Sequence, residues 1–249
     1  MKETFLCQVI LLFAAPNIVM SNEYDECGAV NKNVGHFAIS DTRVEDIYAP
    51  WLASVVQYYS VKNVTDYRVI CSGSILTVKI IVTAAHCFKD ERYLPSHIRV
   101  GGNRKDNRYV VERKIQEYKR HPNYRKPEYY FDVAVIIMDN DLSFSQRIQS
   151  ICLPQNVSSY PGANSHITIQ GWGIDDDGNR GESASEVSVG IRSIPECNHR
   201  FKDAGPFRDR VNDWLPDLIK ENILFCAESD LNTHLGTCTS DSGGPAIQK

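Results

Sequence analysis

The chain has 249 residues, of which 42% are hydrophobic, so it can bury a sizeable core as one domain or as two small ones. Its 27 Lys and Arg residues against 31 Asp and Glu residues give a net charge of −4, which excludes a general electrostatic basis for binding nucleic acid. The basic residues between Arg113 and Lys126 are interpreted as solvated loop charges rather than as an anion site.

The N-terminus has the pattern of a secretory signal. Lys2 precedes an apolar run over residues 5–15, and Val19-Met20-Ser21 offers a cleavage site before Asn22. The run is too short to span a membrane, and no later stretch is long enough to do so. A buried helix is the alternative for this segment. The sequence predicts a signal peptide over residues 1–21 and an extracellular location.

Loss of the signal peptide would remove Cys7 and leave seven of the eight cysteines. These are Cys27, Cys71, Cys87, Cys152, Cys197, Cys226 and Cys238. In an oxidising compartment they should form disulfides, and their spacing lacks the paired Cys-x-x-Cys ligands of a zinc site. Because seven is an odd number, one thiol has no partner within the chain. We expect no bound metal.

Two glycosylation sequons support the prediction of secretion. They are Asn63-Val64-Thr65 and Asn156-Val157-Ser158. Such triplets are frequent by chance, so they carry less weight than the signal peptide. We expect N-linked glycans at Asn63 and Asn156.

Short β-branched segments occur along the chain and are separated by Gly, Pro and polar residues. The segments are 75–76, 80–82, 98–100, 109–111 and 133–138, and segments 166–170 and 187–191 alternate with period two. Helical signals are confined to a turn after Pro195 and to residues 217–222. Many short strands divided by turn residues predict an all-β barrel or sandwich.

A candidate nucleophile lies in the segment Cys238-Thr239-Ser240-Asp241-Ser242-Gly243-Gly244-Pro245. A serine hydroxyl is a poor nucleophile at neutral pH, so it needs a neighbouring base and donors for the oxyanion that it creates. The glycines after Ser242 let the backbone bend sharply and approach a substrate closely. An ordinary turn is the alternative for these eight residues taken alone.

Two upstream segments supply a candidate base and a candidate acid. His86 lies in Thr83-Ala84-Ala85-His86-Cys87, and Asp132 opens the apolar segment Asp132-Val133-Ala134-Val135-Ile136. Separately, the histidine could be structural and the aspartate could cap a turn. With the Ser242 segment, they resemble the motifs of the chymotrypsin- and trypsin-like serine proteases. The order His, Asp, Ser differs from the orders in subtilisins and in α/β-hydrolases.

The resemblance extends from about Pro50 to the last residue. Cys71-Ser72-Gly73-Ser74-Ile75-Leu76 resembles the family's Cys-Gly-Gly-Ser-Leu-Ile strand, and segments 50–55, 121–124, 151–154 and 171–173 also match. The family resemblance implies a double six-stranded antiparallel β-barrel over residues 37–249, after a pro-segment at 22–36. Because the family's chain continues beyond the serine, we expect the second barrel to be incomplete at the C-terminus and the sequence to be part of a longer protease.

The resemblance also implies a disulfide pattern. The implied pairs are Cys71 with Cys87, Cys197 with Cys226, and Cys27 with Cys152. Cys238 would remain unpaired, since its partner in the family lies beyond the serine.

The function implied by the resemblance is that of a secreted serine endopeptidase acting through an acyl-enzyme. Ser242 would be the nucleophile, His86 the general base, and Asp132 the residue that orients the histidine. The backbone N–H groups of Ser240 and Ser242 would bind the oxyanion, and Asp241 would pair with a new N-terminus after proteolytic activation. Protein or peptide substrates and protease inhibitors are the implied partners, and no cofactor is required. The sequence does not indicate an oligomeric state.

At three positions the departure from the family pattern bears on activity. Ser240 replaces a glycine at the first oxyanion donor. Gly236, six residues before Ser242, replaces the aspartate of trypsin-like specificity pockets, so we expect a preference for a neutral side chain. The expected activation region at 37–40 follows His36 instead of Arg or Lys. The alternative function is therefore a catalytically inactive homologue that acts as a binding or regulatory module.

Overall fold

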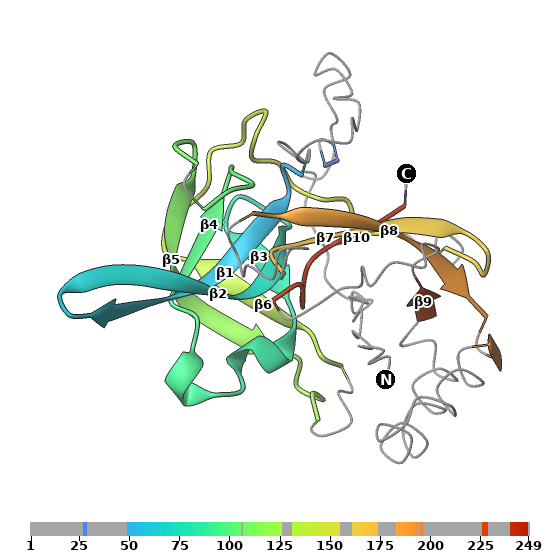
Figure 1. The fold of residues 1–249 in the computed structure, drawn as a ribbon, viewed down its shortest axis with the longest axis horizontal. Helices are drawn as coiled ribbons and strands as arrows, with labels where there is room; N and C mark the ends of the chain where they lie inside the picture. The colour runs from blue at the N-terminus through green and yellow to red at the C-terminus, as the bar shows by residue number, and fades with distance from the viewer. Residues whose placement is uncertain are drawn as a thin grey trace.

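The computed structural model describes residues 27–28, 49–105, 107–125, 131–154, 161–173, 183–193, 195–196, 226–228 and 240–248. These residues form a closed barrel and a second sheet, with only short helical turns (Figure 1). No helix among them is long and apolar enough to cross a membrane.

The closed barrel has the strand order β1-β2-β3-β6-β5-β4. Its strands are β1 (Leu52–Val61), β2 (Val64–Ile75), β3 (Ile80–Thr83), β4 (His97–Val100), β5 (Val111–Arg120) and β6 (Ala134–Met138). All neighbouring strands are antiparallel, and β1 pairs with β4 to close the ring. Closure gives every strand a hydrogen-bonded neighbour on both sides, so the ring of strands has no open edge.

The core of the barrel consists of β-branched and other apolar side chains that point inward. In β6, Ala134, Ile136 and Met138 are buried and alternate with half-buried residues, as the period of two in a strand requires. Ile75 and Ile81 are fully buried beside them. The apolar segments that the sequence predicted as strands therefore supply the interior of this barrel.

Two strands extend further than the sequence predicted. The predicted segment 75–76 is only the end of β2, and the predicted segment 109–111 contributes only Val111 to β5. The interpretation of the basic residues after Arg113 as loop charges was wrong for residues 113–120, which lie in β5. In β5, exposed and half-buried side chains alternate, and no side chain is fully buried. Val111, Ile115 and Tyr118 of β5 pack against the core, but a bulge between Ile115 and Glu117 shifts their spacing, so the sequence shows no regular alternation.

A long hairpin of β1 and β2 projects from the barrel (Figure 1). Lys62 and Asn63 connect the strands, with φ angles of 49° and 65°. Positive φ at both central residues is the backbone of a type I′ turn, which suits the twist of a two-residue hairpin and favours asparagine. Val61 and Val64, which flank the turn, are 56% and 66% exposed. The sequon asparagine, Asn63, is thus at the hairpin tip.

The second sheet has the strand order β10-β7-β8-β9 among the residues described. Its strands are β7 (His166–Gly171), β8 (Ser185–Arg192), β9 (Cys226–Glu228) and β10 (Ala246–Ile247). Ile167, Ile169, Val189 and Ile191 form its buried cluster. The two alternating segments are therefore strands, as predicted. Residues 195–196 are helical, whereas the predicted helix at 217–222 lies outside the described residues.

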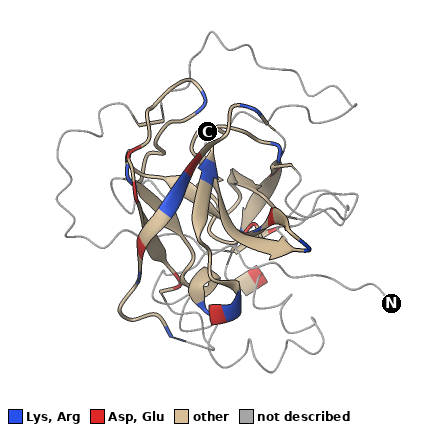
Figure 2. Ribbon diagram, turned by 90° about the vertical axis from the view of Figure 1, so that its left-hand side faces the viewer, with Lys and Arg blue, Asp and Glu red and all other residues tan. Residues whose placement is uncertain are grey.

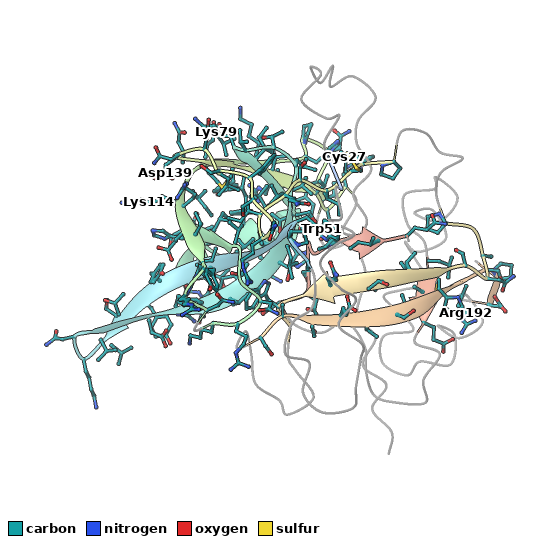
Figure 3. All side chains as sticks on the ribbon, turned by 90° about the horizontal axis from the view of Figure 1, so that it is seen from above. Cys27, Trp51, Lys79, Lys114, Asp139 and Arg192 are labelled. Carbon is teal, nitrogen blue, oxygen red and sulfur yellow. A yellow bond between two sulfur atoms is a disulfide. The ribbon has the colours of Figure 1, made fainter. Side chains whose placement is uncertain are left out.

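The barrel and the second sheet are joined through buried side chains. The Trp51 indole N–H donates to Oε1 of Gln170 in β7, at 2.9 Å. Figure 3 shows Trp51 where the barrel meets the second sheet. Leu52, Trp172 and Ala184 form a small apolar cluster at the same junction. These contacts align the end of β7 with β1 and β2.

Acidic and basic residues are mixed on the face of the barrel shown in Figure 2. Lys105 Nζ lies 3.3 Å from a carboxylate oxygen of Asp66, and Arg99 Nε lies 3.8 Å from one of Glu112. In each of these pairs the carboxylate offsets part of the positive charge of its basic neighbour.

Candidate active site

His86 and Asp132 are brought together by two neighbouring strands of the barrel. His86 lies in the 3-10 turn η2 (Ala85–Phe88), just after β3, and Asp132 lies two residues before β6. Since Thr83 at the end of β3 is opposite Ala134 at the start of β6, the two residues meet at the same end of the barrel. The backbone N–H of His86 donates to Oδ1 of Asp132 at 2.7 Å, and Nδ1 of His86 lies 2.6 Å from Oδ2.

The Asp132 carboxylate is enclosed by the protein, whereas the histidine reaches the surface. The side chain of Asp132 is 0% exposed and that of His86 is 18% exposed. An ionised carboxylate can only accept hydrogen bonds, so Nδ1 of His86 carries the proton between them. In neutral imidazole the other nitrogen, Nε2, then has the lone pair. The pair therefore presents a histidine oriented to act as a base.

A disulfide holds this turn against β2. Cys71 in β2 is bonded to Cys87, which directly follows His86, with a Cα–Cα distance of 6.1 Å. A second disulfide joins Cys27 to Cys152, with a Cα–Cα distance of 5.1 Å. Two of the three disulfides implied by the resemblance thus lie wholly within the described residues.

The remaining cysteines are described only in part. Cys226 is disulfide-bonded, and its expected partner Cys197 lies outside the described residues. Cys238, Gly236 and Asn156 also lie outside them, so the predictions for these positions stay predictions.

The loop that carries Ser242 packs against the barrel beside His86. Ser72 in β2 donates its N–H to the Ser242 carbonyl at 3.0 Å. Gly243 has φ of +84°, and a Cβ at this position would lie 2.2 Å from Oγ1 of Thr83. Only glycine accommodates both the positive φ and the close approach. Because Thr83 is three residues before His86, this contact places the Ser242 loop next to the histidine turn.

Ser240 has a backbone conformation that is unusual for a residue with a Cβ. Its φ is +81°, and the residue is 4% exposed. Its hydroxyl donates to the Val69 carbonyl at 3.2 Å, and its own carbonyl accepts from the Ser72 hydroxyl at 2.8 Å. Sequence reasoning did not identify Ser72 as part of the site. The available signal was that Ser72, like Ser240, occupies a position where the family motif has glycine.

Asp241 fastens the same loop to the second sheet. Its Oδ1 accepts a hydrogen bond from the Gly173 N–H at 2.7 Å. A Cβ at Gly171 or Gly173 would lie 2.1 or 2.2 Å from a carboxylate oxygen of Asp241. The absence of side chains at both glycines therefore makes room for this carboxylate at the end of β7.

One group of possible metal ligands lies close to the site. The ligand atoms of Cys71, His86 and Cys87 are within 4.8 Å of one another. Zinc binds cysteine as the thiolate, and both sulfurs here are bonded to each other. This group therefore does not make a metal site while the disulfide is intact.

Comparison with known proteins places the chain in a family. The family model Trypsin matches residues 39–249. The barrel, the second sheet and the His86–Asp132 pair agree with this match. The chain belongs to the trypsin family of serine proteases.

Known relatives match most of this chain and a smaller part of their own length. The chain is 26% identical over 235 residues to Limulus clotting factor C of Carcinoscorpius rotundicauda, covering 89% of this chain and 22% of that protein. It is 30% identical over 205 residues to serine proteinase stubble of Drosophila melanogaster, covering 80% of this chain and 24% of that protein. The chain thus spans about a quarter or less of these two relatives.

A solved structure supports the fold. Neuropsin, a serine protease expressed in the limbic system of mouse brain, superposes with a TM-score of 0.58 and 23% identity. The superposition covers 82% of this chain and 80% of neuropsin. The all-β, trypsin-like fold expected from the sequence is confirmed.

Proposed function

We propose that this chain is a secreted serine endopeptidase that hydrolyses peptide bonds with His86, Asp132 and Ser242. The observation that carries the proposal is the buried Asp132 carboxylate, 2.6 Å from Nδ1 of His86, beside the loop that contains Ser242. Family membership supports a hydrolytic activity on proteins.

In the first half of the reaction, the Ser242 hydroxyl oxygen attacks the carbonyl carbon of a peptide bond. Its proton passes to Nε2 of His86, and the carbonyl oxygen becomes an oxyanion. When the tetrahedral intermediate collapses, the carbon–nitrogen bond breaks and His86 gives the proton to the leaving amine. The product is an ester between Ser242 and the acyl part of the substrate.

In the second half, water attacks the ester carbonyl and gives a proton to His86. The ester bond breaks, the proton returns to the Ser242 oxygen, and the acid product leaves. The Asp132 carboxylate keeps the imidazole in one tautomer and stabilises the imidazolium that forms twice in the cycle.

The backbone N–H groups of Ser240 and Ser242 are the proposed donors to the oxyanion. Donors that are already oriented before the reaction stabilise the developing charge without reorganisation. The loss of one such donor typically lowers the rate by about 10²–10³-fold. The conformation of Ser240 is therefore important for the rate.

We propose that the enzyme is made as a precursor. Residues 1–21 would be the signal peptide and 22–36 the pro-segment, which the Cys27–Cys152 disulfide would keep attached to residues 37–249 after activation. The new N-terminal ammonium would pair with Asp241, whose Oδ1 also accepts from the Gly173 N–H. Such a pairing would connect cleavage of the precursor to the order of the oxyanion loop.

The proposed substrates are proteins or peptides with a neutral side chain before the cleaved bond. By resemblance to the family, residue 236 would form the base of the specificity pocket, and a glycine there would provide no carboxylate for Arg or Lys. Matched peptide substrates that differ only in this residue test the preference: faster cleavage after Arg or Lys would contradict it. Protease inhibitors would be further partners, and no cofactor takes part in the proposed chemistry.

A fluorophosphonate probe, which reacts with activated serines, tests the function on the full-length secreted protein. We expect labelling of the wild type, loss of labelling in Ser242→Ala and His86→Ala, and unchanged labelling in the control Ser143→Ala, an exposed serine. No labelling of a correctly folded wild type would overturn the proposal. It would favour an inactive homologue that acts as a binding or regulatory module.

A further inference from the structure

We propose that Ser72 is a positioning residue for the oxyanion-binding loop. Its hydroxyl holds the carbonyl of Ser240, and this contact fixes the direction in which the Ser240 N–H points. The inference rests on the proposed function and identifies a residue on which the same site depends.

The hydroxyl, the backbone N–H and the carbonyl of Ser72 all take part in hydrogen bonds. Its side-chain hydroxyl donates to the Ser240 carbonyl at 2.8 Å and accepts from the backbone N–H of Trp172 at 2.8 Å. Its backbone N–H donates to the Ser242 carbonyl at 3.0 Å, and its carbonyl accepts from the Thr83 hydroxyl at 2.7 Å. Since Ser72 is 0% exposed, water does not compete for these groups. One buried residue therefore connects β2, the end of β7 and the Ser242 loop.

The contacts of Ser240 determine the orientation of its backbone. The Ser72 hydroxyl fixes the carbonyl of Ser240, and the Val69 carbonyl fixes the Ser240 hydroxyl at 3.2 Å. These two bonds hold the carbonyl carbon and the side chain of Ser240. Because the Cα has the L configuration, the backbone nitrogen can then occupy only one position. The φ angle of +81° then sets the direction of the N–H. Both anchoring residues belong to β2.

The need for such anchoring follows from the residue type at position 240. The left-handed region is unfavourable for a residue with a Cβ, whereas glycine enters it readily. A serine there persists only if its surroundings hold it in that conformation. If Ser72 lost its hydroxyl, Ser240 would lose the bond that opposes relaxation toward negative φ. The Ser240 N–H would then turn away from the oxyanion position.

A purely structural role for Ser72 makes a different prediction. In that case Ser72→Ala would lower stability and activity because it leaves the buried Trp172 N–H without its acceptor. The size of this loss would not depend on which residue is at position 240. If Ser72 positions Ser240, the cost falls when residue 240 is glycine. Measuring the effect of Ser72→Ala in two backgrounds therefore separates the two roles.

The experiment measures the rate constant for fluorophosphonate labelling, together with kcat and KM for a peptide ester. In the native background, we expect Ser72→Ala to lower labelling and kcat by about 30-fold, less than the 10²–10³-fold for complete loss of a donor, with little change in KM. In the Ser240→Gly background, we expect Ser72→Ala to lower the labelling rate constant and kcat by about threefold or less. Equal losses in the two backgrounds, or no loss in the native one, would overturn the proposal.

Ser54→Ala is the matched control. Ser54 is 2% exposed and donates its hydroxyl to a backbone carbonyl, that of Arg99, at 3.4 Å. We expect its substitution to lower the unfolding midpoint in urea without changing the labelling rate. If labelling fell as much in this control as in Ser72→Ala, the loss of any buried hydroxyl would lower the labelling rate. That result would overturn the proposal.

Failure of the proposed function gives a different result. If the folded wild type does not react with the probe, the activity is absent, and the contact is tested by unfolding midpoints in urea. We expect Ser72→Ala to lower the midpoint more in the native background than in the Ser240→Gly background. Equal shifts would show that Ser72 does not hold Ser240 in its conformation.

Discussion

The carboxylate of Asp132 receives two hydrogen bonds from a single residue, His86: one from the backbone N–H at 2.7 Å and one from Nδ1 of the ring at 2.6 Å. The first bond fixes where the histidine turn lies, and the second fixes how its ring is turned. Both depend on a side chain that carries only acceptors.

Replacing Asp132 with asparagine should therefore change the chemistry more than the fold. If the amide NH₂ faced the backbone N–H of His86, two donors would oppose each other, so the amide oxygen should keep that bond. The NH₂ would then donate to Nδ1, and the ring would adopt the other tautomer. We expect Asp132→Asn to lower the rate of fluorophosphonate labelling by about 10⁴-fold, the loss typical of a wrong tautomer in such a triad. The measurement is the labelling rate at equal concentrations of folded protein.

Asp139 provides a matched control for this substitution. Its Oδ1 also accepts a backbone N–H, that of Lys114, at 3.0 Å, and Figure 3 shows both residues on the barrel, away from Trp51 and the second sheet. We expect Asp139→Asn to label at the wild-type rate. A similar loss in both variants would indicate a general structural effect.

Gly243→Ala should disrupt the Ser242 loop. The left-handed conformation costs a residue with a Cβ about 1–2 kcal/mol, and the new atom would overlap Oγ1 of Thr83 at 2.2 Å. We expect a lower free energy of unfolding, by at least this amount, and loss of labelling. Gly162→Ala is the control, because no heavy atom lies within 4 Å of a Cβ at Gly162. Equal unfolding midpoints for the two variants would contradict the packing described here.

Removal of the disulfide between Cys71 and Cys87 should loosen the histidine turn. The two cysteines are 16 positions apart, and closing a loop of this size contributes about 3 kcal/mol in the chain-entropy model. We expect the double alanine variant to lose about this much stability in chemical denaturation. Because Cys87 follows His86 directly, labelling should decrease as well. Full labelling at wild-type stability would mean that the hydrogen bonds to Asp132 hold the histidine turn without the disulfide.

A glycan at Asn63 is predicted from its position at the tip of the β1–β2 hairpin. Asn63 and Thr65 are both exposed, so the transferase can reach the sequon. We expect treatment of the secreted protein with a peptide N-glycosidase to lower its apparent mass, with a smaller change for Thr65→Ala. This variant keeps asparagine at the position with positive φ. An unchanged shift in Thr65→Ala would place the glycan elsewhere.

Tyr58 should titrate at unusually high pH. Burial, and then its hydrogen bond to Glu112, raise the pKa of Tyr58 from the usual 10.0 to about 12. The folded state thus binds the phenolic proton more strongly than the unfolded chain does. The resulting contribution to stability is present in full below pH 10 and is lost as the pH rises through about 12.

The absorbance of tyrosinate in the near ultraviolet measures this titration. A difference titration against Tyr58→Phe should isolate one phenol with a pKa near 12. In Glu112→Gln the acceptor is neutral, so we expect this pKa to fall toward 10. A pKa that is the same in the wild type and in Glu112→Gln would exclude Glu112 as a cause.

The sequence makes a more specific prediction for the candidate site than for the outer strands. His86, Asp132 and Ser242 lie in short motifs whose residue types serve one chemistry, so a few neighbouring residues suffice to point to it. The first half of β2 lies in the projecting hairpin and has no fully buried side chain. In β5, Val111, Ile115 and Tyr118 pack on the core, but a bulge between Ile115 and Glu117 breaks their regular alternation. Backbone hydrogen bonds to neighbouring strands form these segments, and a linear sequence does not display those bonds.

The contact between Ser72 and Ser240 could not be predicted in the same way. The residues are 168 positions apart, and their contact depends on how the last loop lies against β2. Each substitution by itself looks like a minor departure from a motif. The side-chain hydroxyl of one and the carbonyl of the other become partners only in the folded chain.

The anchoring of the Ser242 loop determines which part of the molecule carries the proposed catalytic residues. His86 and Asp132 belong to the closed barrel, and Ser242 is hydrogen-bonded to its strand β2. The chain joins the second sheet immediately afterwards, where the Pro245 carbonyl accepts from the Gln170 N–H at 3.1 Å. Asp241, directly before Ser242, is hydrogen-bonded to the Gly173 N–H at the end of β7. Both halves of the molecule therefore hold the loop, and a hinge movement between them would pull Ser242 away from one of its two supports.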